Sequence, residues 1–148
     1  MISGRLDMLV QGDKLLDYIP QRPPMVMIGR LEEASDTRFV SSFTIEVDNI
    51  FVEDNLLRES GIIENIAQTT AAGKGYMQKS NGKPVALGFI AAIKSLQINM
   101  LPNIGKELRT IVEVVNKVAD VTIILGEVYT GDTLVASCEM RIFIQPEK

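Results

Sequence analysis

Residues 61–68, Gly-Ile-Ile-Glu-Asn-Ile-Ala-Gln, open the longest stretch of helical pattern in the chain. A helix is expected from about Gly61 to Lys79, with Ser60 as its N-cap and the segment 73–76 as its frayed end. Apolar and small residues cover nearly all of its first three turns, namely Ile62, Ile63, Ile66, Ala67, Thr70, Ala71 and Ala72. A helix that is apolar nearly all round is buried. The stretch therefore predicts one long helix at the centre of the fold.

The rest of the chain has mainly the pattern of β-strands. Two strands are expected before the long helix, and four after it in a meander. They are Met25–Glu33, Thr37–Val47, Pro84–Met100, Glu107–Lys117, Val121–Tyr129 and Leu134–Gln145. A short helix is expected at Asp13–Ile19, and residues 48–58 are expected to be irregular. One antiparallel sheet wrapped around one helix is an α+β architecture, expected to form a single domain over residues 1–148. Its long edge strands favour a dimer that continues the sheet.

Composition and charge exclude several classes of function. The net charge of −4 lacks the basic footprint of a nucleic-acid binder. No apolar run approaches the roughly 18–20 residues that span a bilayer. The segment 1–7 lacks the charged-then-apolar pattern of a secretion signal, and the single cysteine, Cys138, fits a reducing compartment, so a cytoplasmic protein is expected. Cys138 stands in a predicted strand, where a small buried side chain is expected rather than a reactive thiol.

The chain has no histidine at all. Histidine is the side chain whose ordinary pKa suits proton transfer near neutral pH. Acid–base chemistry in this chain alone must therefore fall to carboxylates, tyrosine, lysine or water. Without histidine, and with one cysteine, neither a metal site nor a cofactor is expected.

Several strings resemble the β-hydroxyacyl-acyl carrier protein dehydratases, which have the hotdog fold. Residues 62–68, Ile-Ile-Glu-Asn-Ile-Ala-Gln, are similar to the helix motif of that family and are the most specific part of the match. The segment 19–25 followed by 27–30 resembles its opening motif, and 88–94 resembles the strand after its helix. Pro102 and Gly105 stand where the family has a Pro-Gly loop. The resemblance covers residues 15–146 and implies a sheet wrapped around one central helix.

The resemblance also implies a catalytic pair, a loop histidine and a helix carboxylate from opposite protomers of a dimer. The carboxylate corresponds to Glu64. The loop histidine corresponds to Ile50, beside the matching Phe51, and the histidine of the opening motif corresponds to Gln21. Since the family removes a proton next to a thioester carbonyl, and isoleucine cannot accept one, the chain carries half of that pair.

Other residues are expected near the same carboxylate. Gln68 lies one helical turn beyond Glu64 and is either a second catalytic residue or a helix residue bonded to a facing strand. The resemblance places a backbone amide that polarises the thioester at Ala91. The helix N-terminus near Gly61 is a further place to stabilise negative charge. Ile50, Phe51, Gly61 and Ala91 are thus the expected substrate-binding positions.

Three functions remain open. The first is a dehydratase-type protein that binds an acyl thioester on acyl carrier protein or coenzyme A, with Glu64 acting alone or beside a histidine from a related subunit. The second is a thioesterase in which Glu64 directs water at the thioester. The third is an acyl-binding subunit without catalysis. A homodimer or higher oligomer is expected, or a mixed oligomer with a histidine-bearing relative.

Overall fold

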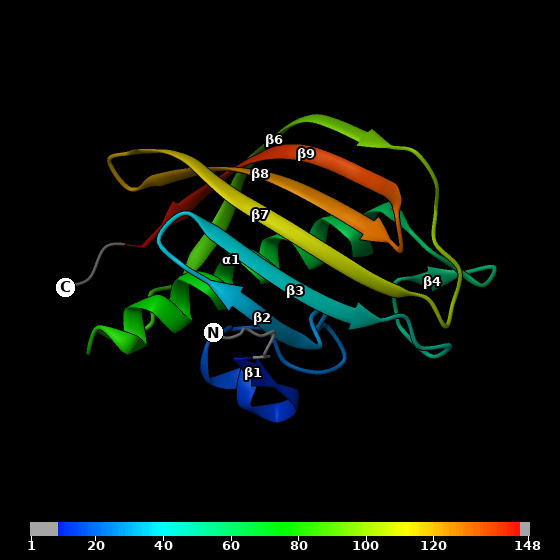
Figure 1. Cartoon of the computed structure of the whole chain (residues 1–148), viewed down its shortest axis with the longest axis horizontal. Coiled ribbons are helices and arrows are strands. Elements are labelled where there is room, and N and C mark those ends of the chain that lie inside the picture. Colours follow the sequence, from blue (N-terminus) through cyan, green and yellow to red (C-terminus); the bar gives the residue numbers. More distant parts are fainter. Residues whose placement is uncertain (1–8, 146–148) are drawn as a thin grey trace.

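The computed structural model describes residues 9–145, so the segment 1–7 examined for a secretion signal lies outside the described residues. A curved antiparallel sheet wraps around the long helix α1 (Glu59–Ser80), which runs behind the strands in Figure 1. The predicted α+β architecture, one sheet around one central helix, is confirmed. It is the hotdog fold.

The main sheet has seven strands in the order β1-β2-β3-β7-β8-β9-β6. Their bounds are β1 (Val10–Gln11), β2 (Arg30–Ala34), β3 (Arg38–Thr44), β6 (Gly88–Ile98), β7 (Glu107–Val118), β8 (Val121–Thr130) and β9 (Thr133–Ile144). The expected four-strand meander is wrong in one respect. β7, β8 and β9 are neighbours in chain order, but β6 pairs with β9 at the far edge while β7 pairs with β3. Strand alternation shows which face is buried, but it carries no information on which strand is the neighbour.

The central helix is buried along most of its length, as its composition predicts. Its buried residues are Gly61, Ile62, Asn65, Ile66, Gln68, Thr69, Thr70, Ala72, Gly73 and Gly75. Ser60 is not the N-cap: the helix begins at Glu59, and the amides of Gly61 and Ile62 donate to the carbonyl of Arg58. The reason is that strand pairing ends at Leu57, which leaves Arg58 extended at the cap position.

The segment 73–76 is not a frayed end. The helix continues through it to Ser80, and the glycines allow close approach to other elements. A Cβ at Gly73 would overlap the ring of Phe39, and one at Gly75 would lie 2.7 Å from the carbonyl oxygen of Tyr18. These glycines therefore bring the helix against the sheet and the N-terminal segment.

Gly73→Ala is expected to destabilise the protein by about 1–3 kcal/mol because the added methyl group overpacks the core against Phe39. The sign of the change in the free energy of unfolding is informative, since replacing glycine with alanine in an open helix interior stabilises a protein by about 1 kcal/mol. Urea unfolding of the two proteins measures the difference. A more stable variant would contradict the close packing, and Phe39→Leu in the same chain should recover part of the loss.

Short elements precede the long helix in the chain, and the sequence predicts them only in part. A 3₁₀ helix, η1 (Gly12–Asp17), takes the place of the predicted helix at 13–19. The segment expected to be irregular contains a hairpin of β4 (Val52–Glu53) and β5 (Leu56–Leu57). Its turn residues Asp54 and Asn55 both have positive φ, 55° and 65°. Two such residues form the type I′ turn that matches strand twist, so Asp-Asn was a usable hairpin signal.

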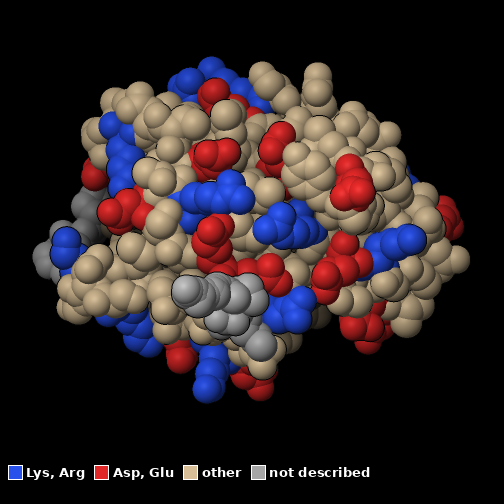
Figure 2. Space-filling view, viewed as in Figure 1, with Lys and Arg blue, Asp and Glu red and all other residues tan. Residues whose placement is uncertain are grey.

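The surface is mixed in charge. Figure 2 shows acidic and basic side chains interspersed over one face of the molecule, without a region of a single sign. Arg30 pairs with Glu107 at 3.1 Å and Arg38 with Glu33 at 2.9 Å. Within residues 9–145, no helix is long and apolar enough to cross a membrane.

Candidate active site

The first turns of α1 present Glu64 and Gln68 on one helix face, and the structure joins them. Gln68 Nε2 donates to Glu64 Oε1 at 2.9 Å and to the carbonyl oxygen of Met25 at 2.9 Å. Gln68 Oε1 accepts from the amide of Met27 at 2.6 Å. A backbone donor on one side and a backbone acceptor on the other fix the orientation of the amide. All three of these hydrogen bonds of Gln68 are made to other residues of the protein, and one of them holds Glu64 in place.

Asn65 binds the same backbone segment from the neighbouring position on the helix. It is fully buried, its Nδ2 donates to the carbonyl oxygen of Met27 at 2.7 Å, and its Oδ1 accepts from Thr110 Oγ1 at 2.5 Å. Thr110 lies on β7, so the network ties the helix to the sheet. A buried amide needs such partners, because leaving it unpaired costs free energy.

These bonds correct the predicted strand at 25–33. Only residues 30–34 form a strand, and the segment 25–29 lies along the helix instead. The reason is that Gln68 and Asn65 bind the peptide groups of Met25 and Met27 that a strand would use in its ladder. The opening motif and the helix motif are therefore one structural unit.

Glu64 itself is only half-buried, unlike its neighbours Asn65 and Gln68. One carboxylate oxygen is held by Gln68, and within the described part of the chain no lysine or arginine forms an ion pair with it. The arrangement is an oriented carboxylate with its second oxygen available for a substrate, a water or another group.

The loop before the helix places Ile50 and Phe51 differently. The side chain of Ile50 is 50% exposed, while Phe51 packs against the core. Asn49 orders this loop, since its Oδ1 accepts from the amide of Phe51 at 2.8 Å and its Nδ2 contacts Met27 Sδ at 3.2 Å. Asn49 therefore connects the loop to the segment that Gln68 and Asn65 hold.

Gly61 and Phe51 lie together at the start of the helix. A Cβ at Gly61 would lie 2.7 Å from the Cβ of Phe51 and 2.7 Å from Leu57 Cδ1. The amide of Gly61 donates to the carbonyl oxygen of Arg58 at 3.0 Å. These contacts give Gly61 a packing role, and substrate binding by Gly61 and Phe51 stays a prediction.

Ala91 lies apart from the loop, on β6 at the edge of the sheet. The register of β6 with β9 shifts between Ile90 and Ala92, so Ala91 has no residue opposite it in β9. Such a bulge leaves the extra residue outside the regular ladder. The edge around it is apolar and exposed, with Phe89 at 55% and Ile93 at 37%. A role for the Ala91 amide stays a prediction that the bulge is compatible with.

Gln21, at the position of the second family histidine, is half-buried. Its Oε1 is shielded and has no hydrogen-bond partner within residues 9–145. Sequence reasoning does not single out Asn65, Asn49 or Thr110 as residues of this site. An asparagine in the middle of an apolar helix was the available signal, because such an amide must find buried partners.

Cys138 is buried at 4% exposure in the core of β9, as expected, and burial raises the pKa of its thiol to about 11. At pH 8 only about one thiol in a thousand would then be the reactive thiolate. We expect slow reaction with an aromatic disulfide reagent in the folded protein and rapid reaction in denaturant. Equally rapid reaction in both states would contradict the burial.

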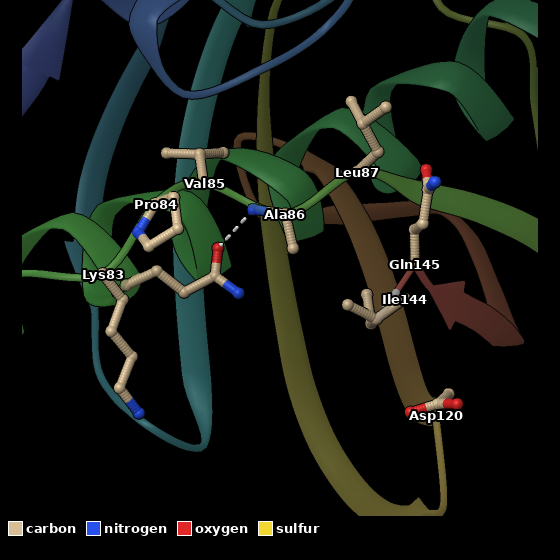
Figure 3. A pocket seen from close by; sticks show the side chains of 9 residues that line it. Lys83, Pro84, Val85, Ala86, Leu87, Asp120, Ile144 and Gln145 are labelled. Atoms are coloured by element: carbon tan, nitrogen blue, oxygen red, sulfur yellow. Dashed lines mark hydrogen bonds between the residues drawn. The ribbon is translucent and has the colours of Figure 1, made fainter. Parts of the chain in front are cut away.

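One cavity of the described residues lies at the other end of the helix. It has a volume of about 460 Å³ and is lined by residues of the segment 83–87 together with Gln78, Asp120, Ile144 and Gln145 (Figure 3). Gln78 is about 21 Å from Glu64 along the helix axis, at 1.5 Å per residue. Glu64, a half-buried oriented carboxylate, therefore does not line this cavity.

Comparison with known proteins agrees with the helix motif. A family model described as ApeP-like, ApeP dehydratase, matches residues 14–148. The chain belongs to the ApeP-like dehydratase family. This confirms the dehydratase-like family that residues 62–68 predict. No curated protein matches the sequence.

Solved structures place the ApeP-like chain among hotdog proteins. A chain of the dehydratase heterocomplex ApeI:P from Xenorhabdus doucetiae aligns with a TM-score of 0.83 at 19% identity, over 90% of this chain and 91% of that one. A hypothetical thioesterase with coenzyme A from Streptococcus pneumoniae aligns with a TM-score of 0.64 at 9% identity, over 80% and 86%. A protein bound to acetyl-CoA from Streptococcus mutans has the same TM-score and identity, over 80% and 89%. These likenesses establish the shared fold.

Proposed function

We propose that this chain supplies the carboxylate half of a β-hydroxyacyl thioester dehydratase and that a histidine-bearing relative supplies the other half. One observation carries the proposal: Gln68 orients Glu64, while an exposed isoleucine, Ile50, stands at the position of the loop histidine. Because the buried amide of Gln68 fixes the orientation of the Glu64 carboxylate, a catalytic role for Glu64 is favoured. The loop cannot complete the pair, because the isoleucine side chain cannot accept a proton.

The chemistry requires two groups. A base removes the proton on the carbon next to the thioester carbonyl, and an acid donates a proton to the β-hydroxyl group as it leaves as water and the double bond forms. We assign the first task to the histidine of the partner and the second to Glu64. The thioester of the substrate, carried on acyl carrier protein or coenzyme A, would lie beside the free oxygen of Glu64.

The edge strand β6 is the surface proposed to receive the partner. It exposes apolar side chains and an unpaired edge, which together favour sheet continuation by a second hotdog chain. The structural neighbour from Xenorhabdus doucetiae is described as a dehydratase heterocomplex, which supports a mixed pair. If loop and helix come from opposite protomers, a mixed dimer has one competent site, with Glu64 and the partner's histidine. The other site contains Ile50 and is inactive.

The proposal is tested by measuring the hydration of an enoyl thioester by the purified chain alone and after it is mixed with a histidine-bearing relative. Loss of a positioned acid–base group costs about 10²–10⁴-fold in rate. We therefore expect the chain alone to be slower than the mixed complex by about that factor. Rapid turnover by the chain alone would overturn the proposal.

Thioester hydrolysis is the second candidate. Two structural neighbours are described with coenzyme A or acetyl-CoA, and one of them as a hypothetical thioesterase. Glu64 would direct water at the thioester carbonyl without a histidine. We expect free thiol to be released from an acyl-CoA by the chain alone, and Glu64→Gln to abolish the release, only if this candidate holds. Equal release by the variant would remove Glu64 from hydrolysis.

A further inference from the structure

A second site lies far from Glu64, where the last turns of α1 meet the turn between β2 and β3 and the end of β7. A cavity of about 160 Å³ there is lined by Lys74, Lys83, Lys117, Ser35, Asp36 and Asn81, among others. We call it the lysine pocket. Its volume is well above that needed for one water. It draws its basic side chains from three separate segments of the chain.

The charges of the lysine pocket are unbalanced. Three lysines line it, with one carboxylate residue, Asp36. Within residues 9–145, none of the three lysines forms an ion pair. Lys74 is half-buried, and its pKa is lowered first by burial and then by repulsion from Lys117. Holding like charges together in a partly desolvated pocket costs free energy that a bound anion would offset.

One structural role for these lysines, bonding to the carbonyl groups at the helix end, is already filled by other groups. The carbonyl groups at the end of α1 accept from the backbone, since the amide of Asn81 donates to Met77 and that of Lys83 to Gln78. Lysines are therefore not needed to satisfy the helix end. Ser35 Oγ accepts from the amide of Arg38 at 3.0 Å and belongs to the turn. The lysines and Asn81 remain as donors facing the cavity.

We propose that the lysine pocket binds a phosphate group. Phosphate matches a compact set of ammonium donors, because lysine binds it as a point charge. A cleft whose lining includes the apolar Val85, Leu87 and Ile144 adjoins the pocket, with Lys83 lining both. Asp120 is the one carboxylate among the residues that line this cleft. In Figure 3 the Lys83 side chain points away from Leu87. The cleft would take the organic part of a phosphate ester.

The test replaces chloride with inorganic phosphate at constant ionic strength and follows binding by calorimetry and the melting temperature. Wild type should bind phosphate and melt at a higher temperature in its presence. Lys74→Met and Lys117→Met should each weaken binding about ten-fold or more. In phosphate-free buffer Lys74→Met should melt no lower than wild type, because it removes a repelled charge. Lys106→Met, an exposed lysine of another loop, is the control and should bind as wild type does.

Two results would overturn the proposal: no binding of phosphate by wild type, or equal weakening by Lys106→Met, which would mean general attraction between surface charge and anions. A second comparison separates the source of the phosphate. Hexyl phosphate should bind more tightly than inorganic phosphate if the ligand is an ester whose organic part lies in the cleft. Equal affinities would support a free-phosphate site and remove the cleft from the proposal.

Discussion

Ile50→His is expected to raise enoyl thioester hydration by the chain alone by about 10²–10⁴-fold, the range that a positioned acid–base group contributes. The substitution restores the group that the dehydratase loop lacks. Ile50 is 50% exposed, so an imidazole can occupy the position without being forced into the core. Initial rates of the purified variant and of wild type, at equal protein concentration, measure the effect.

A matched control separates the position from the mere presence of an imidazole. Val47→His places the same side chain three residues earlier in the loop, where the native residue is 70% exposed. It should leave the rate unchanged. If Ile50→His still binds thioester but gains no activity over this control, the loop held by Asn49 differs from the family loop by more than one side chain.

Gln68→Ala is expected to lower the free energy of unfolding by about 2–5 kcal/mol. The substitution leaves the buried amide of Met27 without a partner, at about 1–3 kcal/mol. It also removes the bond to the carbonyl oxygen of the more exposed Met25, at about 0.5–1.5 kcal/mol. It also frees Glu64, so the mixed complex should lose activity even where the protein remains folded. Urea unfolding and the hydration assay measure the two effects.

Gln78→Ala is the control on the same helix. Gln78 is half-buried and accepts one hydrogen bond, from the amide of Ala86 at 3.0 Å (dashed line in Figure 3). Its loss should cost about 0.5–1.5 kcal/mol and leave the rate of the mixed complex unchanged. Similar costs at both positions would contradict the special place of Gln68 in the network.

The sequence predicts the fold through one element. Apolar and small residues surround α1 on nearly every side, which indicates a buried helix. Because the rest of the chain is mainly strand, the sheet is the element that can bury it. The sequence does not predict that β6 lies at the edge of the sheet or that β7 pairs with β3. A period-two pattern is the same whichever strand is the neighbour. The Asp54-Asn55 turn is a sequence signal for a hairpin, but it stands among other polar residues that favour an irregular loop.

The candidate site is predictable in part. Glu64 and Gln68 are one turn apart in the sequence, so their contact follows from helix geometry. The binding of Gln68 and Asn65 to Met25 and Met27 does not, since it joins residues about forty positions apart. The same bonds explain why the opening motif is not a strand. Long-range partners of buried amides depend on packing, which a single sequence does not display.

The central claim is that Glu64 of this chain acts with a histidine of its partner. It is tested most directly by introducing Glu64→Gln into this chain and measuring hydration of an enoyl thioester by the mixed complex. Glu59→Gln, an exposed carboxylate in the first turn of the same helix, is the control. We predict that Glu64→Gln lowers the rate about 10²–10⁴-fold while Glu59→Gln leaves it unchanged. An intact mixed complex that turns over at the wild-type rate with Glu64→Gln would contradict the claim.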